Sequence, residues 1–368
     1  MKERSLKLKC EALASAIDCS ADNYIVNSQQ DATALNECAA KKSPFNGNVT
    51  IGAGASGAIE LRDFGIIKGA VVAQDNPALT SLLVQGGNVF DGGIDGSVQH
   101  LILRNLSSLT AVSAPTLRLM DGDLAFYNLP SLQNVSLPRL TIVANLHLVG
   151  LPKLETFTVD PVSLGSSGAL EVVDVGLDSI DALFSAGLHA RNVTVDGIDH
   201  VNHLEYSLFQ SENVTIRGNG DLRVTFDCTG CGGDVNRGRQ QTAASLTVSG
   251  ASSVRRNHTL GGQVDSLVVG SFTATQNVAT TLPIDFSNLT SLAIVDNPAL
   301  VALGYNYNFT DYGWQDILIS GNPNLTLKSA GTRGTDWPSP PELGQVWIWP
   351  SRNVSSMVFD GPFDNAFL

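Results

Sequence analysis

Short stretches in which apolar residues occupy every second position recur along the whole chain. Leu101 and Leu103 show this alternation, and Val193 and Val195 show it on either side of Thr194. A period of two places such residues on one face of a β-strand. We therefore expect a strand of about four residues in each stretch, followed by a turn rich in Gly, Asn and Pro.

These strands belong to a repeat. Leu106, Leu129 and Leu151 each follow one strand and are 23 and 22 residues apart. Eleven units can be aligned, and Gln345-Val-Trp-Ile-Trp is a weaker twelfth; the eleven begin at Ala70, His100, Asp123, Asn145, Leu170, Asn192, Asn213, Ser245, Ser266, Ser291 and Asp316. One short strand cannot bury its apolar face alone, so the units must stack into a parallel sheet around a shared aliphatic column. No helical period lies between the units, which argues against folds with helical crossovers.

The sequence therefore predicts an all-β parallel β-helix, or solenoid, of about 11–12 rungs with a short N-terminal helical cap. We divide the chain into five parts. They are a non-native or residual leader segment at 1–16, a Cys-bounded cap at 17–50, a first solenoid half at 51–226, a Cys/Gly-rich insertion at 227–244 and a second, truncated solenoid half at 245–368.

The segment between Cys19 and Cys38, the strand at Asn48-Val-Thr-Ile-Gly and the Leu-rich pattern of 124–140 together resemble the fungal GPI-anchored cell-wall organisation proteins. The resemblance covers roughly residues 17–368. It implies the right-handed β-helix of receptor L-domains and a non-catalytic surface glycoprotein needed for wall integrity. The family has no catalytic residues to transfer.

Sites for N-linked glycans are frequent. Ten of the 26 asparagines lie in Asn-X-Ser/Thr, where chance gives roughly four; they are Asn48, Asn105, Asn134, Asn192, Asn213, Asn257, Asn288, Asn308, Asn324 and Asn353. In Asn192-Val-Thr-Val the valines should point inward, so the asparagine should face outward. These sites lead us to expect an extracellular protein, and the family resemblance implies a place at the cell surface or cell wall with a GPI anchor in the complete protein.

Five cysteines leave at least one thiol unpaired within the chain. Cys19 and Cys38 bracket the cap and fit a disulfide there. Cys228 and Cys231 lie in a Gly-rich loop, which favours a local structural disulfide. Zinc binding, redox chemistry and long-range pairing with Cys10 remain the alternatives.

Two further groups are candidate binding sites. Trp347 and Trp349 would share the outer face if their neighbours point inward, and exposed aromatics can stack on sugar rings; coverage by a terminal segment is the alternative. Asp196, Asp199, His200 and His203 lie close in sequence and could bind a metal, but a solvated turn is the simpler interpretation.

The net charge of −13 disfavours nucleic acid and anionic membranes as partners. No apolar run spans a bilayer, so we expect a membrane link only through a lipid anchor that this chain lacks. Cell-wall polysaccharide and wall or surface proteins are the expected partners, without a cofactor. The alternatives are a polysaccharide-active β-helix enzyme, which would cluster Asp residues on one face, and a binding module that uses the C-terminal aromatics.

Overall fold

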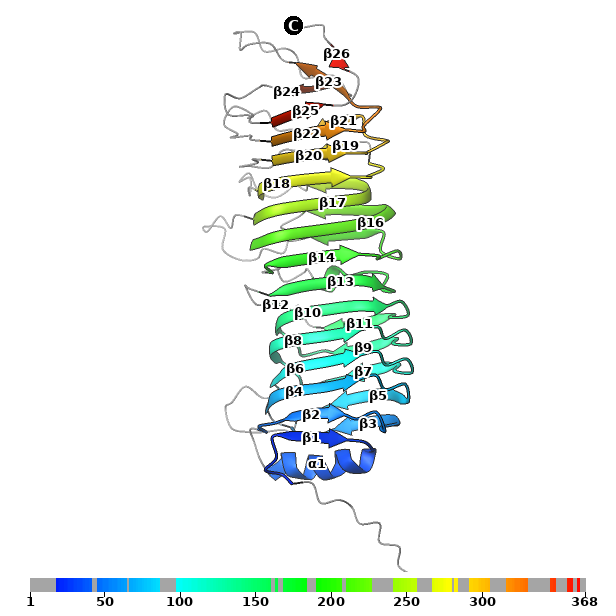
Figure 1. The fold of residues 1–368 in the computed structure, drawn as a ribbon, viewed down its shortest axis with the longest axis vertical. Coiled ribbons are helices and arrows are strands. Elements are labelled where there is room, and N and C mark those ends of the chain that lie inside the picture. The colour runs from blue at the N-terminus through cyan, green and yellow to red at the C-terminus, as the bar shows by residue number, and fades with distance from the viewer. Residues whose placement is uncertain are drawn as a thin grey trace, which may run out of the picture.

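The computed structural model describes residues 18–41, 45–64, 66–86, 97–159, 163–164, 168–183, 190–206, 210–226, 241–256, 267–279, 281–283, 291–304, 316–329, 345–348, 356–359 and 363–364. Within these ranges the chain forms a parallel β-solenoid with an α-helix at its N-terminal end (Figure 1). This arrangement confirms the predicted fold class. No helix among the described residues is long and apolar enough to cross a membrane.

The largest sheet, called here the long sheet, runs the length of the solenoid. Its strands in spatial order are β1 (Asn23–Val26), β2 (Asn48–Ile51), β4 (Ile66–Gln74), β6 (Ser97–Arg104), β8 (Leu119–Tyr127), β10 (Ile142–Leu151), β13 (Ala169–Val175), β14 (Asn192–Asp196), β16 (Gln210–Phe226), β17 (Gln241–Arg256), β18 (Leu267–Thr275), β20 (Ser291–Val295), β22 (Asp316–Ser320) and β25 (Ser356–Phe359). Each of the eleven predicted units overlaps one of the eleven consecutive strands from β4 to β22. The unit predicted to begin at Ser266 is five residues early, because Ser245 of β17 pairs with Ser271 of β18. Two short strands, β12 (Ser163–Leu164) and β15 (His203–Tyr206), pair with β10 and β16 beside this path.

The return legs form smaller parallel sheets. One contains β3 (Gly57–Leu61), β5 (Leu79–Val84), β7 (Ala111–Ser113), β9 (Asn134–Leu137) and β11 (Thr156–Val159). The others are β19 (Thr281–Pro283) with β21 (Ala302–Gly304), and β23 (Thr326–Ser329) with β24 (Gln345–Ile348) and β26 (Phe363–Asp364). The predicted twelfth unit was therefore wrong, because Gln345–Ile348 pairs with β23 and the long sheet continues through β25.

The core follows the predicted alternation. Leu103, Leu148 and Val195 are fully buried, whereas Asn192 is exposed on the other side of its strand. In-register pairing stacks these residues, so that Leu146 of β10 lies between Leu124 of β8 and Leu170 of β13. Each rung thus completes the apolar face of its neighbours, as expected for a solenoid.

A left-handed corner follows most strands of the long sheet. Asn105 and Asn128 have φ angles of 55° and 52°, and Gly150 takes the same place on the next rung with φ 69°. Asn and Gly tolerate this region better than other residues. The Asn128 side chain donates to Oδ1 of Asn105 (3.1 Å), and Asn105 donates to Oδ1 of Asp75 (2.8 Å), so the corners are joined along the outside.

The residue after the corner points into the core, and its chemistry changes along the molecule. In the rungs of β6, β8 and β10 it is Leu106, Leu129 and Leu151, all fully buried, whereas the earlier rung of β4 has the buried Asn76 at this place. In the C-terminal rungs it is Asn277, Asn297 and Asn322, which are 0%, 0% and 2% exposed. We name these sets the leucine ladder and the asparagine ladder.

Each amide of the asparagine ladder bonds the next rung. The Oδ1 of Asn297 accepts from the backbone N–H and the Nδ2 of Asn277, at 3.0 and 2.9 Å. The Oδ1 of Asn322 accepts the equivalent pair from Asn297, both at 3.0 Å. The Nδ2 groups also donate to backbone carbonyls, so these buried polar atoms are satisfied.

The N-terminal cap closes one end of the solenoid. It contains α1 (Gln29–Lys41), which begins where Ser28 Oγ accepts from the N–H of Asp31 at 3.1 Å. A disulfide joins Cys19 to Cys38, as predicted. The helix buries Ala32 and Leu35 against the first rung.

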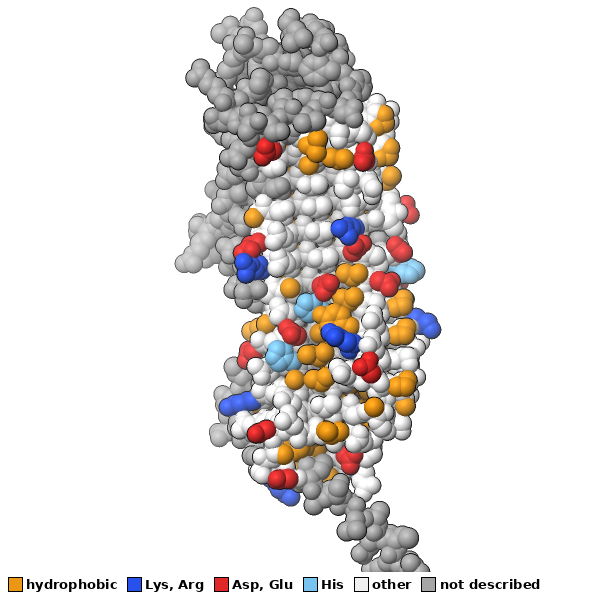
Figure 2. Space-filling model, in the orientation of Figure 1, with side chains coloured by type: hydrophobic (Ala, Val, Ile, Leu, Met, Phe, Trp, Pro, Cys, Tyr) orange, Lys and Arg blue, Asp and Glu red, His pale blue; other side chains and the backbone are white. Residues whose placement is uncertain are grey.

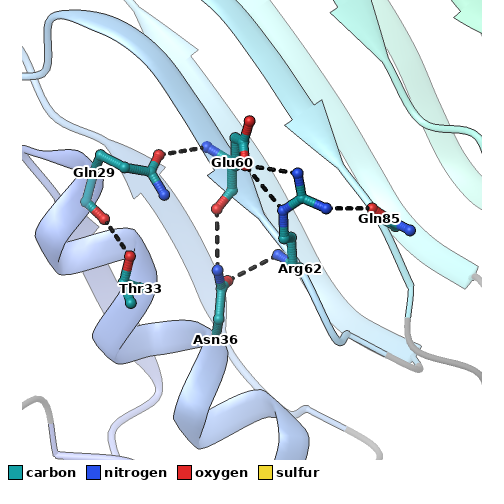
Figure 3. A network of polar contacts seen from close by, with 6 residues as sticks. All are labelled: Gln29, Thr33, Asn36, Glu60, Arg62 and Gln85. Atoms are coloured by element: carbon teal, nitrogen blue, oxygen red, sulfur yellow. Dashed lines mark hydrogen bonds and ion pairs between the residues drawn. The ribbon is translucent and has the colours of Figure 1, made fainter.

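Figure 3 shows how α1 covers the free edge of β3. The Asn36 side chain donates to the carbonyl of Glu60 (3.1 Å) and accepts from the N–H of Arg62 (2.8 Å). The Gln29 side chain accepts from the N–H of Glu60 at 2.8 Å. Side-chain amides therefore replace the missing neighbouring strand, which blocks further strand addition at this edge.

The proposed division into two solenoid halves stays a prediction, as do the parts that lie mainly outside the described residues, 1–16 and 227–244. The long sheet passes this point directly, because β16 pairs with β17 in parallel.

Candidate functional site

The outward side of the long sheet is the broadest regular surface of the described chain (Figure 1). Three outward positions recur on each rung, and pairing in register stacks them into a first, a central and a last column. On β16, for example, these positions are Asn213, Thr215 and Arg217, opposite Ser245, Thr247 and Ser249 of β17. We call this surface the outer face.

Paired charges occupy its N-terminal rungs. His100 of β6 lies 3.4 Å from the carboxylate of Asp123 on β8, and His147 of β10 lies 2.9 Å from that of Glu171 on β13. Farther along, Arg217 of β16 contacts Asp196 of β14 at 3.0 Å. The carboxylates of Glu171 and Asp196 thus contact a side chain on an adjacent strand, and His100 Nδ1 accepts from the backbone N–H of Asp123 at 3.0 Å.

Tyr127 lies in the middle of this charged region. The Arg104 guanidinium is 4.9 Å from its ring centroid, and the His147 ring is 5.8 Å away. Burial, and next the negative charge of Glu171, raise the pKa of Tyr127 above its ordinary value. Because Arg104 and His147 come from the strands on either side, the three side chains tie neighbouring rungs together.

Hydroxyl groups occupy the central column farther along. The central column reads Thr194, Thr215, Thr247 and Thr273 on β14, β16, β17 and β18. Ser249 and Thr275 are opposite each other in the last column. We call these six residues the hydroxyl array. Figure 2 shows charged and His side chains over the lower rungs of this face and white, uncharged surface over β17 and β18 above them.

Exposed asparagines of the glycan sequons confirm the predicted outward placement. The six within the described residues are all exposed: Asn48, Asn105, Asn134, Asn192, Asn213 and Asn324. Asn192 and Asn213 are neighbours in the first column, and the Nδ2 of Asn213 donates to Oδ1 of Asn192 at 2.9 Å. The other four lie outside the described residues: Asn257, Asn288, Asn308 and Asn353. Modification by glycans stays a prediction.

Several predicted residues lie beyond the described structure. Cys10, Cys228, Cys231 and Trp349 are outside it, and the side chain of Trp347 in β24 is not described. The tryptophan pair therefore stays a prediction, as does the loop disulfide.

The His/Asp segment does not assemble into a metal site among the residues described. Asp196 pairs with Arg217, and His203 Nε2 lies 3.4 Å from the hydroxyl of Thr225. No group of three or more His, Cys, Asp or Glu side chains that could hold a metal occurs in the described ranges.

Two features were missed from the sequence. The asparagine ladder was interpreted as turn chemistry, although Asn297-Pro and Asn322-Pro recur at the same place in their units. The hydroxyl array was visible as Ser-Leu-Thr-Val-Ser at 245–249 and Ser-Phe-Thr-Ala-Thr at 271–275. Both signals appear only when units are aligned by rung.

Comparisons with known proteins give limited support for a family. The chain is 24% identical over 205 residues to the protein named cell wall protein ecm33 of Schizosaccharomyces pombe. The match covers 52% of this chain and 40% of that protein, so the chain spans about two fifths of its relative's length. No protein-family model matches the chain, and no solved structure matches it. The findings thus connect a β-solenoid to a relative from the fungal cell wall.

Proposed function

We propose that the protein is a non-catalytic, N-glycosylated component of the fungal cell surface that contributes to cell-wall organisation. In this proposal it is extracellular, its complete form carries a GPI anchor, and the outer face contacts wall polysaccharide or wall proteins. The similarity to cell wall protein ecm33 supports the compartment. Exposure of every described sequon asparagine is the observation that carries the proposal.

The chemistry of the outer face favours contact over catalysis. A glycosidase of the usual kind needs two carboxyl groups facing one bond, one of them able to donate a proton. On the described outer face, Asp123 and Glu171 each contact a histidine, and Asp196 contacts Arg217. Such pairs suit a stable surface better than an acid and a nucleophile.

The test is to secrete the full chain from a yeast host and examine it before and after endoglycosidase treatment. We expect a mass decrease that glycopeptide analysis assigns to the exposed sequons, and co-sedimentation of the protein with isolated fungal walls. Asn134→Gln, on the second sheet, should remove one glycan and leave wall binding unchanged. An unglycosylated secreted protein that stays in the supernatant would contradict the proposal, and release of reducing sugar would favour the enzyme.

A further inference from the structure

Two glycan sequons of the outer face lie on adjacent rungs in the same register. Asn192 of β14 pairs with Asn213 of β16, and Thr194 pairs with Thr215, so the attachment residue and the hydroxyl residue of both sequons coincide. Both asparagines are exposed. Of the six sequon asparagines within the described residues, these two alone face each other across neighbouring strands. The fold therefore brings together two attachment sites that are 21 residues apart in the sequence.

A hydrogen bond fixes how the two side chains lie. The Nδ2 of Asn213 donates to the Oδ1 of Asn192 at 2.9 Å. A side-chain amide carries two hydrogens on Nδ2, so the second hydrogen of Asn213 is left for a sugar, and an N-glycosylated amide keeps one hydrogen to donate. Asn192 supplies its Oδ1 to this bond, so its Nδ2 is not blocked by Asn213. Both sites can therefore carry a sugar while the bond between them persists.

The surroundings keep the pair in place. Val193 and Val214, which separate each asparagine from its threonine, are both 1% exposed and anchor the two strands in the core. The neighbours in the first column are the small residues Ala169 of β13 and Ser245 of β17, so no large side chain pushes the sugars apart. Paired strands lie about 4.8 Å apart, which is close to the thickness of a pyranose ring. Two first sugars attached here would stack face to face with no space for a protein between them.

This crowding matters because N-glycans are trimmed and removed by enzymes that must surround the first sugars. Each glycan of the pair blocks one side of the other. Asn134 offers the contrast, because its neighbours on the second sheet are Ala111 of β7 and Thr156 of β11, and neither lies in a sequon. A glycan on Asn134 is open to an enzyme from both sides of its strand.

We propose that Asn192 and Asn213 carry a stacked pair of N-glycans in which each glycan shields the other from processing enzymes. This inference rests on the proposed N-glycosylation of the secreted protein, and it names which two of its glycans act together. The pair is set apart by the coincidence of two sequons on adjacent rungs, because the strand spacing is common to the whole sheet. It lies on the outer face between the His147–Glu171 contact and Thr247 of β17.

The experiment measures deglycosylation at each site of the folded protein. The full chain is secreted from a yeast host that does not extend the outer mannose chains, and it is treated with endoglycosidase H without denaturation. Glycopeptide mass spectrometry then follows Asn134, Asn192 and Asn213 separately over time. We expect the pair to be cleaved at least about tenfold more slowly than Asn134, because restricted approach lowers the rate of productive encounter. After denaturation all three sites should be cleaved at the same rate, which also provides a reference that does not depend on Asn134.

Removing one glycan should expose the other. In Asn213→Gln, the glycan on Asn192 should be cleaved as fast as the one on Asn134, and Asn192→Gln should have the same effect on Asn213. Thr215→Val destroys the second sequon but keeps the Asn213 amide, so equal acceleration at Asn192 would show that the sugar gives the protection. Asn134→Gln is the matched control and should leave the pair slow. Far-ultraviolet circular dichroism and melting temperature verify the folding of each variant.

Equal cleavage rates at the pair and at Asn134 in the folded protein would overturn the inference, as would unchanged protection in the three variants that remove one glycan of the pair. Occupancy of only one site of the pair in each molecule would also overturn it. Glycans on Asn134 but on neither Asn192 nor Asn213 would overturn it and leave the proposed function standing. Absence of glycans from all described sequons would overturn both.

Discussion

The N-terminal rungs β6, β8 and β10 and the C-terminal rungs β18, β20 and β22 share one backbone repeat but differ at two positions. Inside, the corner is followed by leucine in the first region and by asparagine in the second. Outside, histidine–carboxylate pairs give way to side chains that are uncharged on β18 and β20, with Asp316 at the start of β22. The repeat itself therefore requires only the inward aliphatic columns and the left-handed corner. The residue after the corner and the outward residues can differ between regions, and these differences can change the stability and the surface chemistry of each region.

The largest expected loss of stability comes from placing the residue type of one ladder into the other. Asn297→Leu removes an amide that accepts from Asn277 and donates to buried carbonyls, so several polar groups lose their partners. We expect a loss of about 3 kcal/mol or more, because each unsatisfied buried group costs about 1–3 kcal/mol. Leu129→Asn should cost a similar amount by burying an amide among apolar side chains.

The midpoint of denaturant unfolding, followed by circular dichroism, measures both variants. Asn202→Ala, an exposed asparagine outside both ladders and outside every sequon, is the control and should change stability little. If either ladder variant unfolded at the wild-type midpoint, leucine and asparagine would be interchangeable after the corner, and the proposed difference between the two regions would be wrong.

Removing the disulfide of the N-terminal cap should lower the stability of the nearby rungs more than that of the C-terminal rungs. The disulfide closes a segment of 19 residues, and loops of this length contribute about 3 kcal/mol. Because a solenoid is stabilised by nearest-neighbour contacts, the double variant Cys19→Ser/Cys38→Ser should weaken β1 and β2 first. Hydrogen exchange of backbone amides should accelerate there and stay unchanged in β18 and β20. Uniform acceleration along the sheet would show that the rungs unfold as one unit.

The exposed ion pair Arg191–Glu212 should contribute little. Its atoms are 2.7 Å apart, but both side chains are more than half exposed, and solvent screens such pairs so that they contribute little to stability. Arg191→Ala should therefore shift the unfolding midpoint only slightly, and less still at high salt. A large, salt-independent shift would mean that Arg191 supports the fold by packing.

The smallest effect concerns Tyr127 in the charged region. Its folded pKa is raised, so the unfolded chain loses this proton first as the pH increases. The contribution of Tyr127 is fully present below about pH 10, the unfolded value, and is lost as the pH rises through the folded pKa. When phenol ionisation is followed by ultraviolet absorbance, Tyr127→Phe should remove one tyrosine that ionises at a pH above the ordinary value. If the tyrosine that is lost ionised at the ordinary pKa, burial of Tyr127 would be contradicted.

Much of the fold could be predicted from alternation alone. Residues such as Leu103 and Val195 are apolar at every second position, and this pattern is sufficient to place them inside. The twelfth unit could not be placed, because Val346 and Ile348 alternate just as well on the sheet formed by β23 and β24. Periodicity identifies a strand but does not identify its neighbour.

The candidate surfaces were harder to predict because they depend on stacking between distant units. The exposure of Asn192 and Asn213 follows from one strand at a time. Asn297, in contrast, becomes an inward residue only because Asn277 and Asn322 supply its partners from other rungs. Thr247 and Thr273 likewise form an array only once their strands pair in register.

Binding to isolated fungal walls by two folded variants tests the central claim most directly. Thr247→Lys with Thr273→Lys changes the outer face, and Thr158→Lys adds the same residue at an exposed position of β11 on the second sheet. The account predicts that the first variant loses wall binding at least tenfold and that the second binds like the unmodified protein. Retained binding by the first variant and loss by the second would contradict it.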